Sequence, residues 1–160
     1  MSCNGLLPDR CIPVSPINPK AGFCRFASIA STMDEAARLA ADGAPHGTVV
    51  AAEYQTAGRG RFRSRTWDAA PGSAVLVTVI LDPECIGMAL SGALSREQAP
   101  LSLLPLVLGC GVAETLERGW NLDAAVKWPN DVMVRGRKIA GILCEHRYGK
   151  VCAGIGLNCT

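Results

Sequence analysis

The stretch SAVLVTVIL, residues 73–81, is the clearest strand signal in the sequence, and the expected fold is built outward from it. It is rich in β-branched and aliphatic residues, which favour a pleated and partly buried backbone. Turn-forming pairs bound it on both sides, Pro71-Gly72 before it and Asp82-Pro83 after it. The stretch therefore predicts one β-strand with sharp ends.

On the N-terminal side, two short strands are predicted at 21–30 and 47–55, with a helix between them. Ser31 and Asp34 have the spacing of a capping box, so the helix is expected to begin at Ser31. The alanines and leucine that follow are strong helix formers. Gly43 is expected to end the helix.

On the C-terminal side, a helix and several strands are predicted. In chain order these are a loose segment at 87–99, a helix at 101–118 closed by Gly119, a strand at 124–128, a hairpin at 132–143 and a strand at 151–158. Each predicted helix thus has one or more strands before it and after it in the chain. This order predicts an α+β fold, a mixed β-sheet with helices packed against it.

Length and charge limit the possible partners. A chain of 160 residues fits one domain. Residues 1–20 contain several prolines and lack the pattern of a secretory signal, so an irregular lead-in is expected before a domain at 21–160. The formal charge is +2, so any anionic partner must be met by a local patch. The longest apolar stretch, 101–113, is too short for a bilayer, which needs about 20 residues, so no membrane partner is expected.

The eight cysteines and two histidines do not suggest a metal site. No two cysteines have the C-x-x-C spacing of a zinc or redox site. Cys110 and Cys144 lie in apolar stretches, where a free cysteine behaves as a small hydrophobe. Reduced thiols in a cytoplasmic protein are therefore expected rather than a disulfide framework. His46 and His146 lie far apart, and neither is given a metal role.

The loop GRGRFRSRTW, residues 58–67, carries an arginine at every second position. If the loop is extended, side chains two residues apart share one face, so all four guanidinium groups would point to one region. Gly58 and Gly60 let backbone N–H groups approach an anion closely. Guanidinium groups suit phosphate and carboxylate, which they bind in bidentate fashion. A solvated basic turn and contact with RNA are the alternatives for this loop.

A second cluster of polar residues follows in the last third of the chain. KWPND, residues 127–131, holds Lys127, Asn130 and Asp131 around a proline turn. GRKIAGIL places Lys138 close to Gly141. GIGLN, residues 154–158, ends on an asparagine after two glycines. Each piece alone is a weak signal, but together with EYQTAGRGR they form an ordered set.

From Ser31 to Asn158 the chain resembles the biotin protein ligases, on the pieces STM, EYQTAGRGR, Trp67, KWPND, KIAGIL and GIGLN. The resemblance implies a fold like that of class II aminoacyl-tRNA synthetases and biotin synthetases. It implies an enzyme of the biotin–[acetyl-CoA-carboxylase] ligase type. Members form biotinyl-5′-AMP from biotin and ATP, with Mg²⁺, and then transfer biotin to a lysine of the biotin carrier protein of a carboxylase. A homodimer is a further possibility that the resemblance raises.

The resemblance also implies roles for individual residues. The catalytic set is Lys138, Arg61, Asp131 and Lys127. The biotin site is Ser31, Thr32, Gln55, Gly58, Arg59, Arg61, Lys138, Gly141 and Gly156. The nucleotide site is Arg59, Gly60, Arg61, Trp67, Asn130, Lys138 and Asn158.

Several of these roles have alternatives. Asp131 either helps to place Mg²⁺ or orients the incoming carrier lysine. Ser31 also serves as a helix cap, and Gln55 could be a solvated side chain at a strand end. Trp67 and Trp128 either pack over the ligand or belong to the core.

The sequence departs from the family pattern at three places. Met33 stands where many members have asparagine, so a polar contact there is not expected. The loop after Arg61 reads FRSRTW, one residue longer than usual and without its glycine, so Arg63 and Arg65 match less closely than Arg59 and Arg61. The chain stops soon after GIGLN, so the domain at 21–160 is expected to lack the usual C-terminal part, and no DNA-binding domain is expected before it.

Three other functions remain open on the sequence. Lipoate ligases share the fold and the central lysine, and a non-catalytic biotin-binding protein would need only the binding half of the site. An RNA-binding module would use the arginine loop, although the near-neutral charge argues against it.

Overall fold

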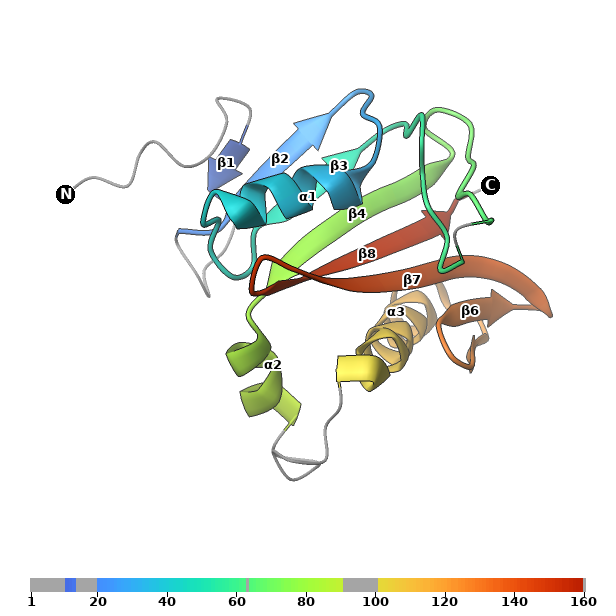
Figure 1. Ribbon diagram of the computed structural model, residues 1–160. Coiled ribbons are helices and arrows are strands. Elements are labelled where there is room, and N and C mark those ends of the chain that lie inside the picture. Colours follow the sequence, from blue (N-terminus) through green and yellow to red (C-terminus); the bar gives the residue numbers. More distant parts are fainter. Residues whose placement is uncertain (1–10, 14–19, 63, 91–100, 160) are drawn as a thin grey trace.

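The computed structural model describes residues 11–13, 20–62, 64–90 and 101–159. Figure 1 shows the elements of this part of the chain. In chain order they are β1 (Cys11–Pro13), β2 (Gly22–Phe26), α1 (Thr32–Ala41), β3 (Val49–Ala52), β4 (Ala74–Leu81), α2 (Pro83–Leu90), the 3-10 helix η1 (Leu101–Leu103), α3 (Leu104–Trp120), β5 (Ala124–Lys127), β6 (Asp131–Val134), β7 (Arg137–Arg147) and β8 (Lys150–Asn158).

The described strands form one mixed sheet in the order β1-β2-β3-β4-β8-β7-β6-β5. β2 and β3 run parallel, and the other neighbours are antiparallel. The longest ladders join β4 to β8 and β8 to β7, over eight residue pairs each. The predicted α+β class with a mixed sheet is confirmed.

The two long helices lie on opposite faces of the sheet and over different halves of it. α1 packs against β3, β4 and β8, whereas α3 packs against β5, β6 and β7 (Figure 1). Two neighbours in β8 show the change of face. Cys152 belongs to the core under α1, and Val151 packs with Ile86 and Leu104 on the other side. Successive strand residues point to opposite faces, so this pattern is what a regular strand requires.

The strands predicted around residues 73–81 and 132–143 are confirmed. β4 spans Ala74–Leu81, and the hairpin is formed by β6 and β7. Its turn holds Arg135 and Gly136, which have φ angles of 50° and 73°. Two successive positive φ angles are what a tight two-residue hairpin needs, and the twist of such a turn matches that of the strands.

Three details of the predicted elements are wrong. The loose segment expected from residue 87 begins inside α2, and residues 91–99 of it lie outside the described residues. α3 continues past Gly119 to Trp120 and is capped by Asn121 in the left-handed conformation, with φ of 52°. The N-terminal lead-in contains the strand β1, which pairs with β2.

Among the described side chains, one cysteine differs from the expectation. Cys85, Cys110, Cys144, Cys152 and Cys159 are free thiols. Cys24, in β2, is disulfide-bonded, so the expectation of reduced thiols throughout is wrong there. Cysteine spacing in the sequence does not reveal which thiols the fold brings together.

No helix among the described residues is long and apolar enough to cross a bilayer.

Candidate functional site

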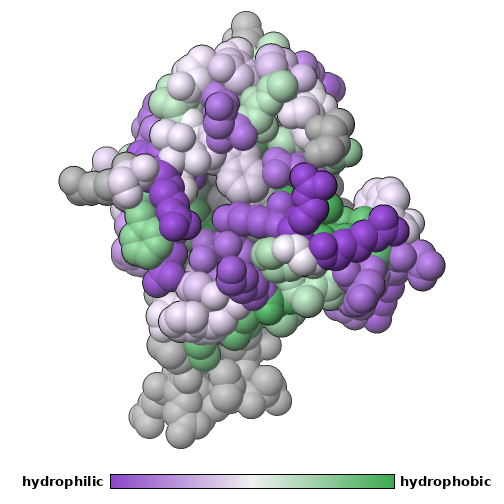
Figure 2. All heavy atoms as spheres, turned by 90° about the vertical axis from the view of Figure 1, so that its right-hand side faces the viewer, coloured by the Kyte–Doolittle hydropathy of each residue, from purple (hydrophilic) through white to green (hydrophobic). Residues whose placement is uncertain are grey.

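A cavity of about 60 Å³ lies on the α1 face of the sheet, between the start of α1, the loop at 58–67 and the central strands. Figure 2 views the molecule from the right-hand side of Figure 1 and shows a band of hydrophilic side chains across the middle of the side that faces the viewer, with apolar surface beside and below it. The cavity is lined by Ser31, Thr32, Met33, Gln55, Arg59, Gly60, Arg61, Trp67, Leu76, Val77, Asn130, Lys138, Gly141, Ile142, Leu143, Gly154, Ile155 and Gly156.

One end of the cavity is polar and buried. Ser31 is the N-cap of α1, but its side chain makes no capping hydrogen bond, so the capping box predicted with Asp34 is wrong. Ser31 is 1% exposed, and its Oγ has no hydrogen-bond partner among the described residues. A buried hydroxyl without a partner costs free energy of about 1–3 kcal/mol, which a bound ligand could recover.

Thr32 and Gln55 form the neighbouring part of the polar end. The backbone N–H of Thr32 donates to Gln55 Oε1 over 2.7 Å, and Thr32 Oγ1 donates to the same oxygen over 3.0 Å. Thr78, in β4, donates its hydroxyl proton to Thr32 Oγ1 over 2.9 Å. Gln55 is therefore bonded to the start of α1 rather than being a free side chain at a strand end.

Glycines form the floor of the cavity because Trp67 lies directly above them. A Cβ on Gly156 would come within 2.6 Å of the Trp67 ring, and one on Gly141 within 3.1 Å. A Cβ on Gly154 would come within 2.7 Å of the sulfur of Met33. Heavier residues at these places would therefore push the indole or the Met33 side chain out of position. The indole Nε1 of Trp67 is buried and has no hydrogen-bond partner among the described residues.

The arginine loop is folded on itself rather than extended. Trp67 N donates to Gly58 O over 3.0 Å, and Gly60 N donates to Arg65 O over 2.8 Å. Arg61 lines the cavity and lies with Arg65 against the Phe62 ring, at 5.5 and 5.6 Å from its centroid.

The arginines do not share one face. Arg59 forms an ion pair of 2.8 Å with Asp34 and a longer one of 3.7 Å with Glu145. Arg65 does not line the cavity, and Arg63 lies outside the described residues. The predicted convergence of four arginines is therefore wrong for Arg65, because the cross-loop hydrogen bonds turn the chain back.

The cationic end of the cavity is formed by Lys138, at the start of β7. Its Nζ lies 2.6 Å from Asp131 Oδ1 and 5.7 Å from the centroid of the Trp67 ring. The turn before Asp131 is fixed by Asn130, whose Nδ2 donates to Ile142 O and whose own carbonyl accepts from Ile142 N. These bonds hold the KWPND turn against the strand that carries Lys138.

Most of the residues predicted from the sequence meet in this cavity. The structure brings together Ser31, Thr32, Gln55, Arg59, Gly60, Arg61, Trp67, Asn130, Lys138, Gly141 and Gly156. Gly58 lies buried beside it, where a Cβ would come within 2.4 Å of Trp67 O. Asp131 reaches the cavity through its ion pair with Lys138.

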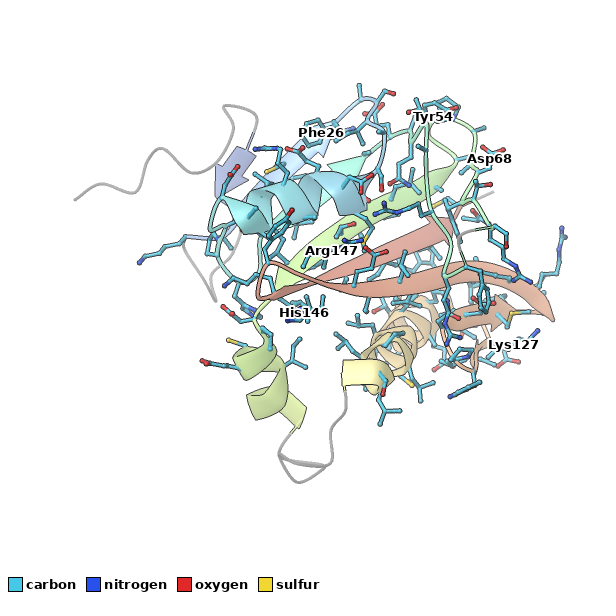
Figure 3. The ribbon with its side chains drawn as sticks, viewed as in Figure 1. Phe26, Tyr54, Asp68, Lys127, His146 and Arg147 are labelled. Carbon is cyan, nitrogen blue, oxygen red and sulfur yellow. The ribbon has the colours of Figure 1, made fainter. Side chains whose placement is uncertain are left out.

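The structure does not bring Lys127, Asn158 and Trp128 into the cavity. Lys127 ends β5 and is exposed, near β6 and apart from Tyr54 and Asp68 in Figure 3. Trp128 is 73% exposed, so it neither packs over this cavity nor belongs to the core. Asn158 lines a second cavity, of about 560 Å³, on the other side of the sheet near α3. Lys138 lines both cavities.

Several lining residues were not singled out from the sequence. They are Leu76, Val77, Ile142, Leu143, Gly154 and Ile155, with Met33 noted only as a departure from the family. Gly154 could have been found, because it lies two residues before Gly156 and therefore on the same face of β8. The apolar ones carry no signal that separates a cavity wall from ordinary core.

The described residues contain no group of three or more histidine, cysteine, aspartate or glutamate side chains that could hold a metal ion. Asp131, the carboxylate considered for Mg²⁺, is bonded to the ammonium group of Lys138. The side chains present do not fit a resident magnesium ion, which prefers several oxygen ligands.

Two thiols lie on the strands that carry the site. Burial raises the pKa of the Cys144 thiol to about 12. Burial, followed by the nearby Glu145, raises the pKa of the Cys152 thiol to about 11. Both are protonated at neutral pH, so neither is a nucleophile for the chemistry of the cavity.

Comparison with known proteins gives one family and consistent relatives. The model of the biotin/lipoate A/B protein ligase family matches residues 25–160. The chain is 36% identical over 135 residues to the bifunctional ligase/repressor BirA of Bacillus spizizenii, covering 81% of this chain and 38% of that protein. It is 34% identical over 158 residues to the biotin–[acetyl-CoA-carboxylase] ligase of Mycobacterium tuberculosis, covering 96% and 56%.

A solved structure gives the same result. The biotin protein ligase of Aquifex aeolicus in complex with biotin and ATP has a TM-score of 0.69 and 31% identity, over 85% of this chain and 51% of that one. The chain spans between about two fifths and three fifths of the length of these three proteins.

Proposed function

Because the chain belongs to the biotin/lipoate A/B protein ligase family, we propose that it is a biotin–[acetyl-CoA-carboxylase] ligase. In this proposal it joins biotin to ATP as biotinyl-5′-AMP and then transfers biotin to a lysine of a carrier protein. The observation that carries the proposal is the two-ended cavity. The buried polar end around Ser31 suits an uncharged ligand group, and the cationic end at Lys138 suits an acidic one.

The polar end is proposed to hold the ureido ring of biotin. This ring has N–H donors and a carbonyl acceptor, and Ser31, Thr32 and Gln55 together offer hydroxyl and amide groups of both kinds. Gly141 and Gly156 let the Trp67 indole lie directly on the strands, and in this proposal the indole is the wall against which the ring system packs. Gly58, which has no side chain, would keep the start of the loop close to the ureido ring.

The cationic end is proposed to hold the biotin carboxylate and the α-phosphate of ATP. A carboxylate oxygen attacks the α-phosphorus, the bond to the pyrophosphate oxygen breaks, and pyrophosphate leaves. Negative charge gathers on the phosphoryl oxygens during this step. Lys138 and Arg61 would stabilise it, and Arg59 would anchor the loop that carries Arg61.

The second step starts from biotinyl-5′-AMP, in which the biotin carboxylate and the phosphate of AMP form a mixed anhydride. The amine of the carrier lysine attacks the carbonyl carbon of the adenylate, AMP leaves, and an amide bond forms. Lys127 and Asp131 are proposed to act where the carrier lysine approaches the adenylate. They face each other across the β5–β6 ladder, and a carboxylate can orient an incoming ammonium group.

The nucleotide is proposed to extend from Arg59, Gly60 and Arg61, past Trp67 and Asn130, toward Asn158. Support comes from Lys138, which lines both the cavity that holds the loop residues and the one that holds Asn158. Mg²⁺ is proposed to enter bound to ATP, as part of the substrate, because Asp131 is already paired with Lys138.

The proposed protein partner is the biotin carrier protein of a carboxylase, and the proposed location is the cytoplasm. The name of the Mycobacterium tuberculosis relative, an acetyl-CoA-carboxylase ligase, supports the carrier assignment.

Pyrophosphate exchange tests the proposal directly. The purified chain is incubated with biotin, MgATP and labelled pyrophosphate, and label is expected to enter ATP only when biotin is present. No exchange, together with no biotin binding by calorimetry, would falsify the proposal.

Lipoate is the second candidate substrate, because the family description covers lipoate as well as biotin. The same exchange assay with lipoate in place of biotin separates the two. A non-catalytic biotin-binding protein is the third outcome. It would bind biotin and yield no biotinyl-5′-AMP in mass spectrometry of the reaction mixture.

A further inference from the structure

Thr78, in the middle of β4, is a buried hydroxyl that connects the core of the sheet to the cavity. Its side chain is 0% exposed, and it does not line the cavity itself. Thr78 Oγ1 lies 2.9 Å from Thr32 Oγ1, which lies 3.0 Å from Gln55 Oε1. A chain of hydrogen bonds therefore leads from the core to a side chain that the ligand can reach.

The direction of this chain is fixed by one backbone group. The N–H of Thr32 can only donate, and it lies 2.7 Å from the Gln55 side-chain amide. The amide atom it meets must therefore be the carbonyl oxygen. The same oxygen accepts from Thr32 Oγ1, so the Thr32 hydroxyl has its proton committed to Gln55 and accepts the proton of Thr78. Bonds arranged head to tail in this way polarise and strengthen one another.

The amide nitrogen of Gln55 is left on the opposite side. A Cβ on Gly58 would come within 3.1 Å of Nε2, so the nitrogen lies beside a residue that has no side chain to cover it. Among the described residues, the hydrogen bonds of the Gln55 side chain all go to Oε1. Two N–H donors therefore remain for a ligand, in a cavity that Ser31 also lines with its partnerless hydroxyl.

We propose that Thr78 is a positioning residue that, through Thr32, holds the Gln55 amide with Nε2 facing the cavity as a donor. The ligand must then present an acceptor oxygen at this place, and a ligand that presents only donors is rejected. The inference rests on the proposed function, because the urea carbonyl of biotin is such an acceptor. In 2-iminobiotin, which is a guanidinium ion at neutral pH, donors replace that oxygen.

The first test compares biotin affinity by calorimetry in wild type, Thr78→Val, Thr78→Ser and Thr48→Val. Thr48 is the matched control, because it is also 0% exposed and its hydroxyl has no partner among the described residues. Thr78→Val keeps the volume but removes the donor, so biotin should bind about tenfold more weakly. Thr78→Ser restores the donor and should bind within about twofold of wild type, as should Thr48→Val.

Equal biotin affinity in Thr78→Val and Thr48→Val overturns the inference and leaves the proposed function standing. Absence of biotin binding by the wild type overturns the proposed function and the inference with it. Thermal unfolding of each variant identifies any that fail to fold. If Thr78→Val is one of them, the ligand preference of Gln55→Glu in the second test decides the inference.

The second test asks which ligand the cavity prefers. Wild type should bind biotin at least about 100-fold more tightly than 2-iminobiotin, because donors would otherwise face donors. Gln55→Glu keeps an oxygen for Thr32 and replaces the donor end by a second oxygen. The preference should therefore reverse in favour of 2-iminobiotin. Thr78→Val should narrow the preference, which a purely structural role of Thr78 would not do. An unchanged preference in both variants contradicts the inferred orientation of the amide.

Discussion

Lys138 is held by a carboxylate in the structure, and this pairing suits the role proposed for it. Its Nζ lies 2.6 Å from Asp131, and the two side chains are 42% and 25% exposed. A partly exposed pair of this kind contributes little stability, up to about 1 kcal/mol. An acidic substrate can therefore take over the ammonium group at low cost, while Asp131 keeps the lysine in place beforehand.

Lys138→Ala is expected to lower the rate of adenylate formation by at least about 100-fold, since the main positive charge at the reacting phosphate is lost. The fold should persist, because the half-exposed ion pair adds little to stability. Pyrophosphate exchange measures the effect. Arg118→Ala is the control, since Arg118 is an exposed residue of α3 that pairs only with Glu114 among the described residues. A rate in Lys138→Ala equal to that of the control would remove this lysine from the mechanism.

Arg61→Gly is expected to let the adenylate escape faster, by about tenfold, because one charged anchor of the loop is gone. Both Arg61 and Arg65 lie against the Phe62 ring, but only Arg61 lines the cavity. Arg65→Gly is therefore the matched variant and should have a smaller effect. A rapid filter assay that follows the release of labelled biotinyl-5′-AMP from each variant gives the two dissociation rates. Equal release rates in wild type and Arg61→Gly would refute the assignment.

The loop at 58–67 and the strand β8 act as one unit, because Trp67 from the loop lies on the glycines of the sheet. The loop closes on itself through the Trp67 N to Gly58 O bond, and Arg59 ties it to α1 through Asp34. The position of the indole therefore depends on a sheet surface without side chains at Gly156 and on an ion pair at the helix start. Changes in either should move the loop and open the cavity.

Gly156→Ala tests this dependence. Its Cβ would come within 2.6 Å of the Trp67 ring, so the indole must move, and biotin affinity should fall by at least about tenfold. Tryptophan fluorescence should change as well. Gly111→Ala in α3 is the matched control, because a Cβ there meets nothing within 4 Å. It should keep biotin affinity and raise the free energy of unfolding by about 0.5–1 kcal/mol. Unchanged affinity in Gly156→Ala would contradict the packing of loop on sheet.

For the molecule as a whole, stability depends on three clusters of buried residues, one on the α1 face of the sheet and two on the α3 face. The core under α1 includes Cys152, and Cys144 packs against the cores beside α3. Both thiols have a raised pKa in the folded state. The unfolded chain releases these two protons at lower pH than the folded chain does. The contribution of these two thiols to the free energy of unfolding is therefore intact below the usual thiol pKa and is lost as the pH rises.

The free energy of unfolding is expected to fall above about pH 9, by up to about 1.4 kcal/mol per pH unit for each of these thiols. The fall should continue to about pH 11 for Cys152 and about pH 12 for Cys144. Urea titrations from pH 8 to 10.5 measure it. The double variant Cys144→Ala, Cys152→Ala should have a flatter profile than Cys110→Ala, which removes an exposed thiol. Parallel profiles would show that these thiols do not ionise on unfolding.

Local patterns were enough for the elements whose signals lie within a few residues. β4 was evident from its apolar run, and the β6–β7 hairpin from a glycine turn between two apolar runs. α2 was missed because Asp82-Pro83 signals a turn and also suits a helix start, where proline needs no N–H partner. The motif residues of the cavity were identified by resemblance, because their types and order are visible in the chain.

The relations between those residues required the folded chain. Which face of β8 carries Gly154 and Gly156 depends on strand register, and a shift of one residue reverses it. The Thr78–Thr32–Gln55 chain joins three segments, and the ion pair between Asp34 and Arg59 joins the start of α1 to the arginine loop. Local propensity is set by neighbours in the chain, whereas hydrogen bonds and ion pairs between distant segments exist only once the sheet has brought those segments together.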